Sequence, residues 1–156
     1  EPSSRILYIR DYNSNGFVFY TNYDSNKGSD ILVNNYAALN VFWGELERQI
    51  RIQGKISKVD DSTSDKYFNA RPRTSKIGAW ASNQSQIIKD RTELEAKIKF
   101  YEEKFNGQDV PRPDNWGGYC LNPNKIEFWQ GRPSRLHDRI VYVKENNQWA
   151  KSRLSP

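Results

Sequence analysis

Alternation of apolar and polar residues predicts strands along much of this chain, and the pattern is clearest between residues 49 and 57. Ile50, Ile52 and Ile56 fall on one face of an extended segment there, while charged and polar residues take the alternate positions. Gly54 falls on the apolar face, where a glycine favours a bulge or a close approach of another backbone. This stretch is therefore predicted to be a half-buried strand.

Shorter β-prone segments lie before and after this strand. The sequence predicts them as strands at residues 5–10, 17–21, 37–43, 117–121, 125–129, 139–144 and 149–154. Turn-forming residues at 13–16, 122–124 and 145–147 are expected to connect neighbouring pairs of these strands. The first of these turns predicts a hairpin near the start of the chain.

A different period, typical of helices, begins near residue 62. Predicted helices cover residues 25–34, 62–71, 72–80 and 91–105. We expect Asp61 or Ser62 to cap the second of these helices, and Pro72 to stop it and to open the third. Many short strands with a few interposed helices indicate a mainly β fold, an antiparallel barrel with helical decoration, over residues 1–156 as a single domain.

The charge balance favours an anionic partner. The chain of 156 residues contains 24 Lys and Arg against 19 Asp and Glu, which gives a formal net charge of +5. Such a balance suits phosphorylated metabolites, nucleic acid or a membrane surface. The positive residues are scattered along the sequence, so we expect no nucleic acid partner. A basic nucleic-acid-binding module would rest on the net charge alone.

Three further features limit the class of protein. Cys120 is the single cysteine, which excludes an intrachain disulfide framework and a multi-cysteine metal site. No apolar run approaches the length of a membrane span and no signal peptide is visible, so we expect a soluble, cytoplasmic protein without a membrane partner. The chain begins at Glu1 and contains no methionine, so we expect it to be part of a longer product.

The richest concentration of functional side chains lies between residues 127 and 139, which include three arginines, the one histidine of the chain, two acids and a tryptophan. Gly131 and Pro133 predict a turn within it. If the segment after the turn is extended, Arg135 and His137 project to the same side. Beside a large aromatic ring they would make a cradle for a flat, anionic ligand. A surface loop with unrelated charges explains the same composition.

A second candidate site lies at the predicted corner between two helices. Tyr67, Arg71 and Ser75 are spaced four residues apart, which would place them on one face of a continuous helix. Pro72 forbids a straight helix, yet a corner there can still bring the phenol, the guanidinium and the hydroxyl together as a grip for a phosphate group. A core tyrosine and an arginine at a helix C-terminus are the alternative.

Several dispersed motifs resemble those of the pyridoxamine 5′-phosphate oxidase family. Trp129-Gln130-Gly131, followed by Arg-Leu-His-Asp-Arg at residues 135–139, is similar to the C-terminal signature of that family. The resemblance continues in residues 71–80, Gln84-Ser85, Arg48-Gln49 and Trp116-Gly117-Gly118. The motifs follow the family's order and cover nearly the whole chain.

The resemblance implies an FMN-dependent oxidase that makes pyridoxal 5′-phosphate from pyridoxamine or pyridoxine 5′-phosphate, the phosphorylated B6 vitamers. Family members have an FMN-binding split-barrel fold and work as homodimers, and residues from about 110 to 156 would form a dimerisation and substrate region. Their reaction moves a hydride from the substrate to the flavin, and molecular oxygen then reoxidises the flavin and yields hydrogen peroxide. No metal is expected. Members usually carry a further N-terminal segment before the point where this resemblance begins.

The family also implies a set of site residues. Contacts to FMN are implied for Arg5, Ile6, Leu7, Tyr8, Ile9, Arg10, Tyr20, Thr21, Lys27, Gln49, Gln84, Ser85, Trp129 and Arg139. Contacts to the substrate are implied for Arg10, Tyr67, Arg71, Ser75, Arg135, Leu136 and His137. Arg135 and His137 would be the catalytic pair, with Arg135 orienting and polarising the substrate. Because family sites draw on both subunits, the two parts of this set need not meet within one chain.

Two positions depart from the family's pattern. The family usually has lysine where this chain has Arg10, and arginine where it has Asn26. A lost charged hydrogen bond is worth about 1.5–3 kcal/mol, so Asn26 is expected to weaken FMN binding by roughly 10- to 100-fold. A non-catalytic flavin- or pyridoxal-phosphate-binding relative is therefore the alternative function.

Overall fold

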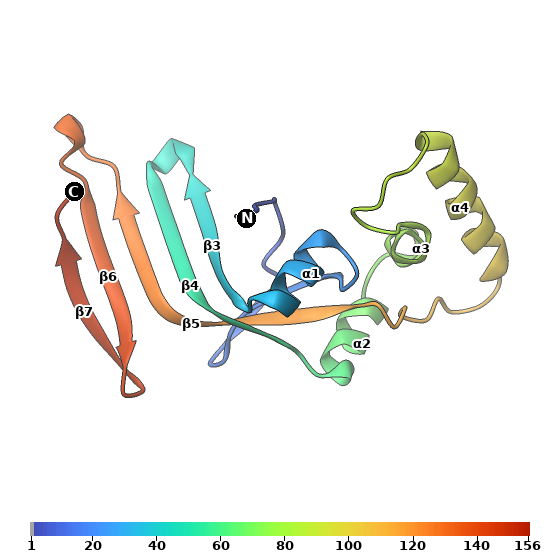
Figure 1. Ribbon diagram of the computed structural model, residues 1–156, viewed down its shortest axis with the longest axis horizontal. Helices are drawn as coiled ribbons and strands as arrows, with labels where there is room; N and C mark the ends of the chain where they lie inside the picture. The colour runs from blue at the N-terminus through green and yellow to red at the C-terminus, as the bar shows by residue number, and fades with distance from the viewer. Residues whose placement is uncertain (1) are drawn as a thin grey trace.

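The computed structural model describes residues 2–156 and divides them into a large sheet and a group of helices (Figure 1). The strands are β1 (Asp11–Asn13), β2 (Gly16–Asn22), β3 (Tyr36–Trp43), β4 (Arg48–Lys58), β5 (Trp116–Gln130), β6 (Asp138–Glu145) and β7 (Gln148–Leu154). The helices are α1 (Asn26–Val33), α2 (Asp61–Asn69), α3 (Arg73–Ala81) and α4 (Arg91–Lys104), with short 3-10 turns at Gly44–Leu46 and Pro133–Arg135. Among the described residues, no helix combines the length and the apolar character needed to cross a membrane.

Strand β5 organises the sheet, because its 15 residues pair with three different neighbours. Its first half lies between β2 and β4, and its second half lies between β4 and β6. β1 continues the sheet beyond β2, β3 beyond β4 and β7 beyond β6, and every one of these pairs is antiparallel. Figure 1 shows β5 running from the helices across to the strands at the other end of the molecule. The predicted mainly β, antiparallel architecture is confirmed.

The turn predicted at residues 122–124 is wrong. β5 continues through this segment, and its pairing with β4 shifts by one residue between Gln53 and Gly54. A Cβ added to Gly54 would lie 2.0 Å from the carbonyl oxygen of Asn122, so a glycine is needed where the two backbones approach each other. The bulge predicted at Gly54 is therefore confirmed. It allows the strand to pass Pro123, which cannot donate a ladder hydrogen bond.

The strand predicted at residues 5–10 is also wrong. This segment is irregular, and β1 starts only at Asp11. The backbone N–H of Arg10 donates to the carbonyl oxygen of Val18 at 2.8 Å, which extends the hairpin by one hydrogen bond. Leu7 and Ile9 nevertheless pack against the main cluster of buried side chains. The apolar residues that suggested a strand thus contribute through packing, without a hydrogen-bonded ladder.

The predicted helices are all present, although their ends differ. The cap of α2 is Asp60 and not Asp61 or Ser62, because the Asp60 carboxylate accepts a hydrogen bond from the backbone N–H of Thr63 at 2.7 Å. Hydrogen bonds from Ser62 and then from Thr63 lower the pKa of Asp60 to about 2. Pro72 lies between α2 and α3, as predicted, and makes the chain turn between them.

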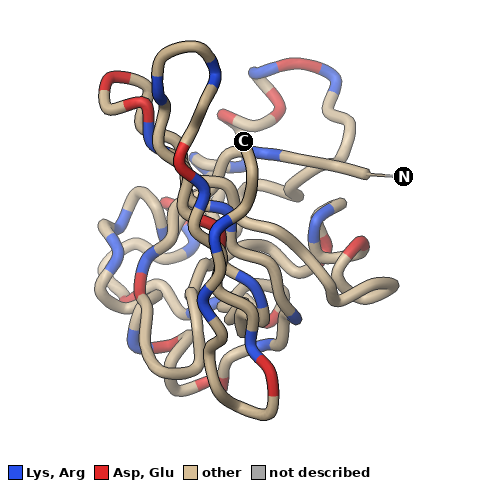
Figure 2. The backbone as a smooth tube through the Cα atoms, turned by 90° about the vertical axis from the view of Figure 1, so that its left-hand side faces the viewer, with Lys and Arg blue, Asp and Glu red and all other residues tan. Residues whose placement is uncertain are grey.

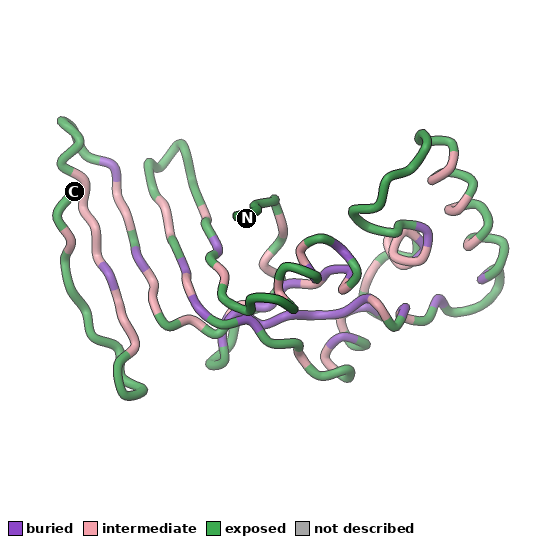
Figure 3. The backbone as a smooth tube through the Cα atoms, viewed as in Figure 1, coloured by how far each residue is buried: buried purple, intermediate pink, exposed green. Residues whose placement is uncertain are grey.

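Two groups of buried side chains hold these elements together. One joins α3 to α4 and consists of Ile77, Phe105 and Val110. The other lies within the sheet and consists of Phe19, Leu39, Ile52, Ile56, Tyr119 and Leu121. Figure 3 shows continuous burial along the first half of β5, which gives way to an alternation of buried and exposed residues in its second half. The second half of the sheet therefore presents side chains on an open surface.

Replacing Gly54 by alanine should destabilise the fold by about 1–3 kcal/mol, the usual cost of overpacking. The added methyl group would meet main-chain atoms of Asn122 and Pro123, which cannot move without separating β4 from β5. Gly44→Ala is the matched control, because its Cβ would meet only the side chain of Phe42, at 3.6 Å. Urea unfolding followed by circular dichroism measures both variants, and equal midpoints would contradict the prediction.

Candidate functional site

A cavity of about 600 Å³ opens between the N-terminal segment, β2 and the corner that joins α2 to α3. Its volume is in the range of pockets for small molecules. Trp116, the first residue of β5, forms part of its wall. Most of the remaining wall consists of residues predicted from the sequence: Ile6, Leu7, Tyr8, Arg10, Tyr20, Thr21, Lys27, Tyr67, Arg71, Ser75 and Gln84.

The cavity carries an uncompensated positive charge. Among the described residues that line it, Arg10, Lys27 and Arg71 are cationic and none is acidic. Burial lowers the pKa of Lys27, and the neighbouring Arg5 lowers it further. Burial also lowers the pKa of Arg71, with Tyr67 opposing this effect and Arg10 adding to it. Cations gathered at such a cost favour the binding of an anion.

Arg71 lies in the turn between the end of α2 and the start of α3, as Pro72 led us to expect. Tyr67 from α2, Arg71 from the turn and Ser75 from α3 reach the same cavity. The guanidinium nitrogen Nη1 of Arg71 is buried and has no hydrogen-bond partner among the described residues. Leaving a buried donor without a partner costs stability. This nitrogen therefore marks a place for an acceptor atom of a ligand.

A short chain of hydrogen bonds fixes another part of the wall. The ammonium group of Lys27 donates to the Thr21 hydroxyl at 2.7 Å, and that hydroxyl donates to the Gln84 carbonyl oxygen at 3.1 Å. The backbone N–H of Asn22 donates to the same Gln84 oxygen at 3.3 Å. With its oxygen occupied in this way, Gln84 keeps its amide N–H groups available as donors.

Nine residues of the predicted set do not line the cavity, and three of these are sequence neighbours of residues that do. Arg5 forms an ion pair with Asp30 at 3.4 Å. Ile9 packs against the core of the sheet. Ser85 follows Gln84 directly but is exposed and has a positive φ of 72°. The structure thus gives Ile9 a packing role and leaves Arg5 and Ser85 close to the cavity in sequence without placing them in its wall.

A second group of predicted residues forms a row across three strands. Gln49 of β4 pairs with Trp129 of β5, which in turn pairs with Arg139 of β6. Directly paired residues of antiparallel strands project from the same face of a sheet. The imidazole of His137 lies against the indole of Trp129, with 4.7 Å between ring centroids. An amide, an indole, an imidazole and a guanidinium are therefore gathered on one face.

The argument from alternation assumed an extended segment before His137, but this segment is not extended. Arg135 ends the 3-10 turn Pro133–Arg135 with a positive φ of 61°. Both Arg135 and Leu136 are exposed. The Nδ1 atom of His137 accepts a hydrogen bond from the backbone N–H of Arg132 at 3.1 Å. The turn, and not the alternation of a strand, decides where these side chains lie.

Glu127 anchors the end of this row and received no role from the sequence. It is only 5% exposed, and its carboxylate accepts a hydrogen bond from Nε of Arg139 at 2.8 Å and lies 3.6 Å from Arg51. The hydrogen bond from Arg139 is the main reason why the pKa of Glu127 is lowered, and Arg51 adds to the shift. The sequence did contain a signal for this role, namely an acid within an apolar strand. A buried carboxylate needs a cationic partner, so such an acid predicts an ion pair.

The cavity and the row of Gln49, Trp129 and Arg139 lie at opposite ends of β5. Trp116, the first residue of β5, lines the cavity, whereas Trp129 lies near its last residue. At about 3.3 Å per residue, a strand of this length reaches up to roughly 50 Å. Figure 1 shows the two ends of β5 far apart. A single chain therefore does not bring the residues of the Trp129 row to the cavity.

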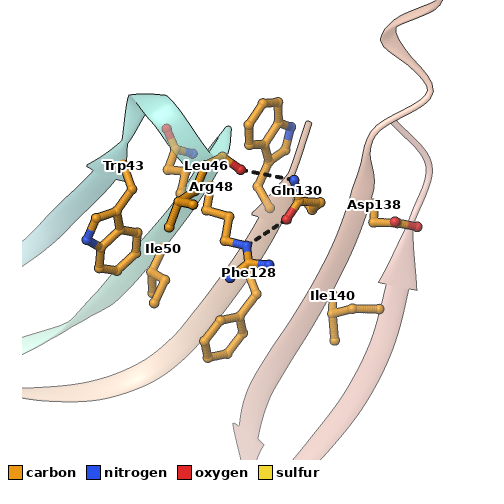
Figure 4. Close-up of a pocket in the computed structure, with 10 residues that line it drawn as sticks. Trp43, Leu46, Arg48, Ile50, Phe128, Gln130, Asp138 and Ile140 are labelled. Atoms are coloured by element: carbon orange, nitrogen blue, oxygen red, sulfur yellow. Dashed lines mark hydrogen bonds between the residues drawn. The ribbon is translucent and has the colours of Figure 1, made fainter. Parts of the chain in front are cut away.

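The opposite face of the second half of the sheet is open and largely apolar, with Arg48, Gln130 and Asp138 as its polar residues. Ile50, Phe128 and Ile140 form a row across β4, β5 and β6 there. Together with Trp43 and Leu46 they line a hollow of about 530 Å³, which Figure 4 shows from close by. Phe128 is 43% exposed and Trp43 is 42% exposed. Such an open apolar surface is typical of an interface with another protein surface.

Comparison with known families decides the classification. Residues 1–105 match the family model described as pyridoxamine 5′-phosphate oxidase, and residues 116–156 match the one described as the pyridoxine 5′-phosphate oxidase C-terminal dimerisation region. The chain belongs to the pyridoxamine 5′-phosphate oxidase family. The resemblance inferred from the motifs is confirmed.

Relatives in this family match over the whole chain. The pyridoxine/pyridoxamine 5′-phosphate oxidase of Cytophaga hutchinsonii is 58% identical over 158 residues, which cover 100% of this chain and 74% of the relative. The protein of the same name from Acaryochloris marina is 51% identical over 156 residues, which cover 100% of this chain and 71% of the relative. These identities support the interpretation of this chain as an oxidoreductase.

Solved structures agree with the fold. PhzG from Burkholderia lata 383, in complex with tetrahydrophenazine-1-carboxylic acid, is 31% identical, with a TM-score of 0.92 over 99% of this chain and 75% of that chain. A pyridoxamine 5′-phosphate oxidase-related, FMN binding protein from Nostoc punctiforme is 16% identical, with a TM-score of 0.75 over 99% of this chain and 81% of that chain. The predicted split-barrel fold class is confirmed by these likenesses.

Replacing Glu127 by glutamine should lower the free energy of unfolding at neutral pH by on the order of 2 kcal/mol, because a charge-assisted hydrogen bond to Arg139 is lost. The lowered pKa of Glu127 means that its ionised form is stabilised by folding. This stabilisation is present above the unfolded pKa of about 4.3 and is lost as the pH falls through the lower folded pKa. The gap between wild type and variant should therefore shrink below about pH 4.

Asp138→Asn is the matched control. Its carboxylate also contacts two arginines, Arg132 and Arg153, but it is far more exposed than Glu127, so its loss should cost less. Unfolding by urea at a series of pH values measures all three proteins. A gap between wild type and Glu127→Gln that stays constant down to acid pH would contradict the assignment.

Proposed function

We propose that this chain is an FMN-dependent oxidase that converts pyridoxamine or pyridoxine 5′-phosphate to pyridoxal 5′-phosphate. The observation that carries this proposal is the cavity wall, in which three cations face no acid and one buried Arg71 nitrogen lacks a partner. Relatives named pyridoxine/pyridoxamine 5′-phosphate oxidase, at 50–58% identity, support the substrate class. For the amine substrate, oxygen and water would be consumed, and aldehyde, ammonia and hydrogen peroxide formed.

The substrate phosphate would be held at the corner between α2 and α3. Arg71 offers in-plane guanidinium donors, and Tyr67 and Ser75 each add a hydroxyl to the same cavity. Arg10 lies in the same wall, and its guanidinium lies over the Tyr8 ring at 4.4 Å. This arrangement suits a doubly charged phosphate group better than a carboxylate, because several donors approach it from different elements.

The cavity also has donors that fit FMN, which carries its own phosphate and a flat ring with hydrogen-bonding edges. Lys27 and Arg10 would neutralise the phosphate, and the free amide N–H groups of Gln84 would bond to an edge of the ring. Bound FMN would supply the hydride acceptor and the reaction with oxygen. Asn26 is exposed at the start of α1 and does not line the cavity, so the cations that remain supply the charge.

A second copy of the chain would complete the site. The row of Gln49, Trp129 and Arg139 lies too far from the cavity of its own chain, and the family model for residues 116–156 describes a dimerisation region. We infer a homodimer in which residues 1–156 act as one domain and the part from about residue 110 contributes to the partner's site. The apolar face around Phe128 would be covered in this assembly.

Arg135 and His137 would then act on the substrate from the partner. Because Nδ1 of His137 accepts a hydrogen bond from the backbone, the neutral ring carries its proton on Nε2 and can donate it to a ligand atom. Arg135 is exposed at the end of its turn, and its guanidinium offers donors and no acceptor, so it suits orientation and polarisation of the substrate and not proton abstraction.

The alternative functions make different predictions about the same preparation. A non-catalytic relative would bind flavin without producing peroxide. A basic nucleic-acid-binding module would bind no flavin. Figure 2 shows Lys and Arg interspersed with Asp and Glu along the backbone, which gives little support to such a module.

The test is peroxide release from FMN-loaded protein after addition of pyridoxamine 5′-phosphate. We expect flavin bands in the visible spectrum and peroxide formation by the wild type. Arg135→Ala should keep the flavin bands and lose about 10- to 100-fold in turnover, the range of a lost charged hydrogen bond. Arg153→Ala, which removes an exposed arginine from β7, is the matched control and should retain activity. Flavin-loaded wild type that makes no peroxide would defeat the enzyme assignment.

Phe128→Glu should convert the dimer into monomers, because it places a charge in the centre of the apolar face. Phe100→Glu is the matched control, since Phe100 is 58% exposed on α4, at the other end of the molecule (Figure 1). Light scattering after size-exclusion chromatography measures the mass of both variants. A dimeric Phe128→Glu protein would contradict the proposed interface.

A further inference from the structure

Three aromatic rings from different elements lie nearly parallel beside the cavity. Tyr20 of β2 stacks on Tyr67 of α2 with 3.9 Å between centroids and an angle of 13°. The indole of Trp116 makes an angle of 9° with Tyr20 and of 5° with Tyr67. Arg71 adds a fourth planar group, with its Cζ atom 4.6 Å from the centroid of Trp116. We call the three rings and the Arg71 guanidinium together the aromatic platform.

The Trp116-Gly117-Gly118 motif gives this platform its geometry. A Cβ added to Gly118 would lie 2.8 Å from the Tyr20 ring, so a side chain there would push the ring out of the assembly. A Cβ added to Gly117 would lie 2.0 Å from the Tyr23 hydroxyl oxygen. Gly118 therefore leaves room for the Tyr20 ring, and Gly117 leaves room for the Tyr23 hydroxyl, beside the start of β5.

Arg71 differs from Arg112 and Arg139 in what holds it. The guanidinium of Arg112 is held by Asp61, by Asp65 and by the Trp116 carbonyl oxygen, at 2.6 to 2.8 Å. Arg139 is held by Glu127. Arg71, in contrast, forms no ion pair with a described acid, and its Nη1 atom has no partner. Its guanidinium is instead packed over the rings of Trp116 and Phe68.

This difference has an electrostatic consequence. An acid that held Arg71 in place would neutralise its charge and repel an incoming phosphate. An aromatic ring orients the guanidinium through its faces and leaves the in-plane N–H groups free to donate. A bound anion would oppose the burial that lowers the pKa of Arg71.

We propose that Trp116 is a positioning residue, which orients Arg71 towards the phosphate of the ligand without using any of its donors. The proposal rests on the proposed function, because it takes the ligand of this cavity to be a phosphorylated B6 vitamer. Trp116 acts through Arg71 and does not itself hold the phosphate. Its contribution should therefore appear only for ligands that carry a phosphate group, and only while residue 71 is an arginine.

The first test compares the affinity of FMN-loaded wild type, Trp116→Leu and Trp116→Phe for pyridoxal 5′-phosphate and for pyridoxal, which lacks the phosphate. We expect Trp116→Leu to weaken binding of the phosphorylated ligand about tenfold, which corresponds to about 1.4 kcal/mol. Binding of pyridoxal should stay within about twofold. Trp116→Phe retains a ring face and should recover most of the loss. In turnover, Trp116→Leu should raise KM for pyridoxamine 5′-phosphate and leave kcat nearly unchanged.

The second test is a double-mutant cycle with Arg71→Lys, which keeps the charge but removes the planar group. If Trp116 acts through Arg71, the double variant should bind pyridoxal 5′-phosphate no more weakly than Arg71→Lys alone. Additive losses would overturn the proposal, because they would show that Trp116 acts independently. Equal losses for pyridoxal and its phosphate in Trp116→Leu would also overturn it, since they would indicate a collapsed cavity.

Trp149→Leu is the matched control, because Trp149 is an exposed residue of β7 and should leave both affinities unchanged. Failure of the proposed function would appear in the wild type, as the absence of peroxide or of any preference for the phosphorylated ligand. Failure of the present proposal would appear only in the variants, in a wild type that prefers the phosphorylated ligand and makes peroxide.

Discussion

The backbone ladder of β5 carries both parts of the candidate site. Its first residues pair with β2, its last with β6, and β4 accompanies it for most of its length. Trp116 at one end lines the cationic cavity, and Trp129 near the other end belongs to the row with Gln49 and Arg139. Because hydrogen bonds fix this strand from both sides, the two parts keep a constant separation. In an assembly of two chains, the Trp129 row of one chain can therefore meet the cavity of the other without a change of shape within either chain.

The arginines of this protein show two ways of holding a cation in place. Arg139 is bound by the buried Glu127, which satisfies its charge and stabilises the sheet. Arg71 is packed on aromatic rings and keeps its charge and an unpartnered nitrogen. The first arrangement favours the stability of the empty protein, whereas the second favours a ligand. Their positions agree with this difference, since Arg139 lies on a strand of the sheet and Arg71 lies in the cavity wall.

The sequence predicted correctly those features that depend on residues close together in the chain. The spacing of Tyr67, Arg71 and Ser75 around Pro72 predicted their convergence, because a helix corner depends on nearby residues. The irregular segment at residues 5–10 was predicted as a strand, because propensity cannot tell whether a neighbouring strand is available for pairing. The turn residues at 122–124 were misleading for the same reason, since pairing with β4 continues through Asn122 and Pro123 and overrides their preference. Glu127 was given no role because its partners Arg139 and Arg51 come from other strands.

The bulge opposite Gly54 also decides which side of the sheet each side chain of β5 faces. In a regular strand, residues separated by an odd number of positions face opposite sides of the sheet. Trp116 and Trp129 are separated by an odd number, but the one-residue shift between Gln53 and Gly54 reverses the alternation, so that both project from the same side. The same reversal keeps Leu121 and Ile126 together on the apolar side, with Ile56 and Ile52 as their partners. One inserted residue thus lets a single strand serve a core on one side and two distant candidate binding surfaces on the other.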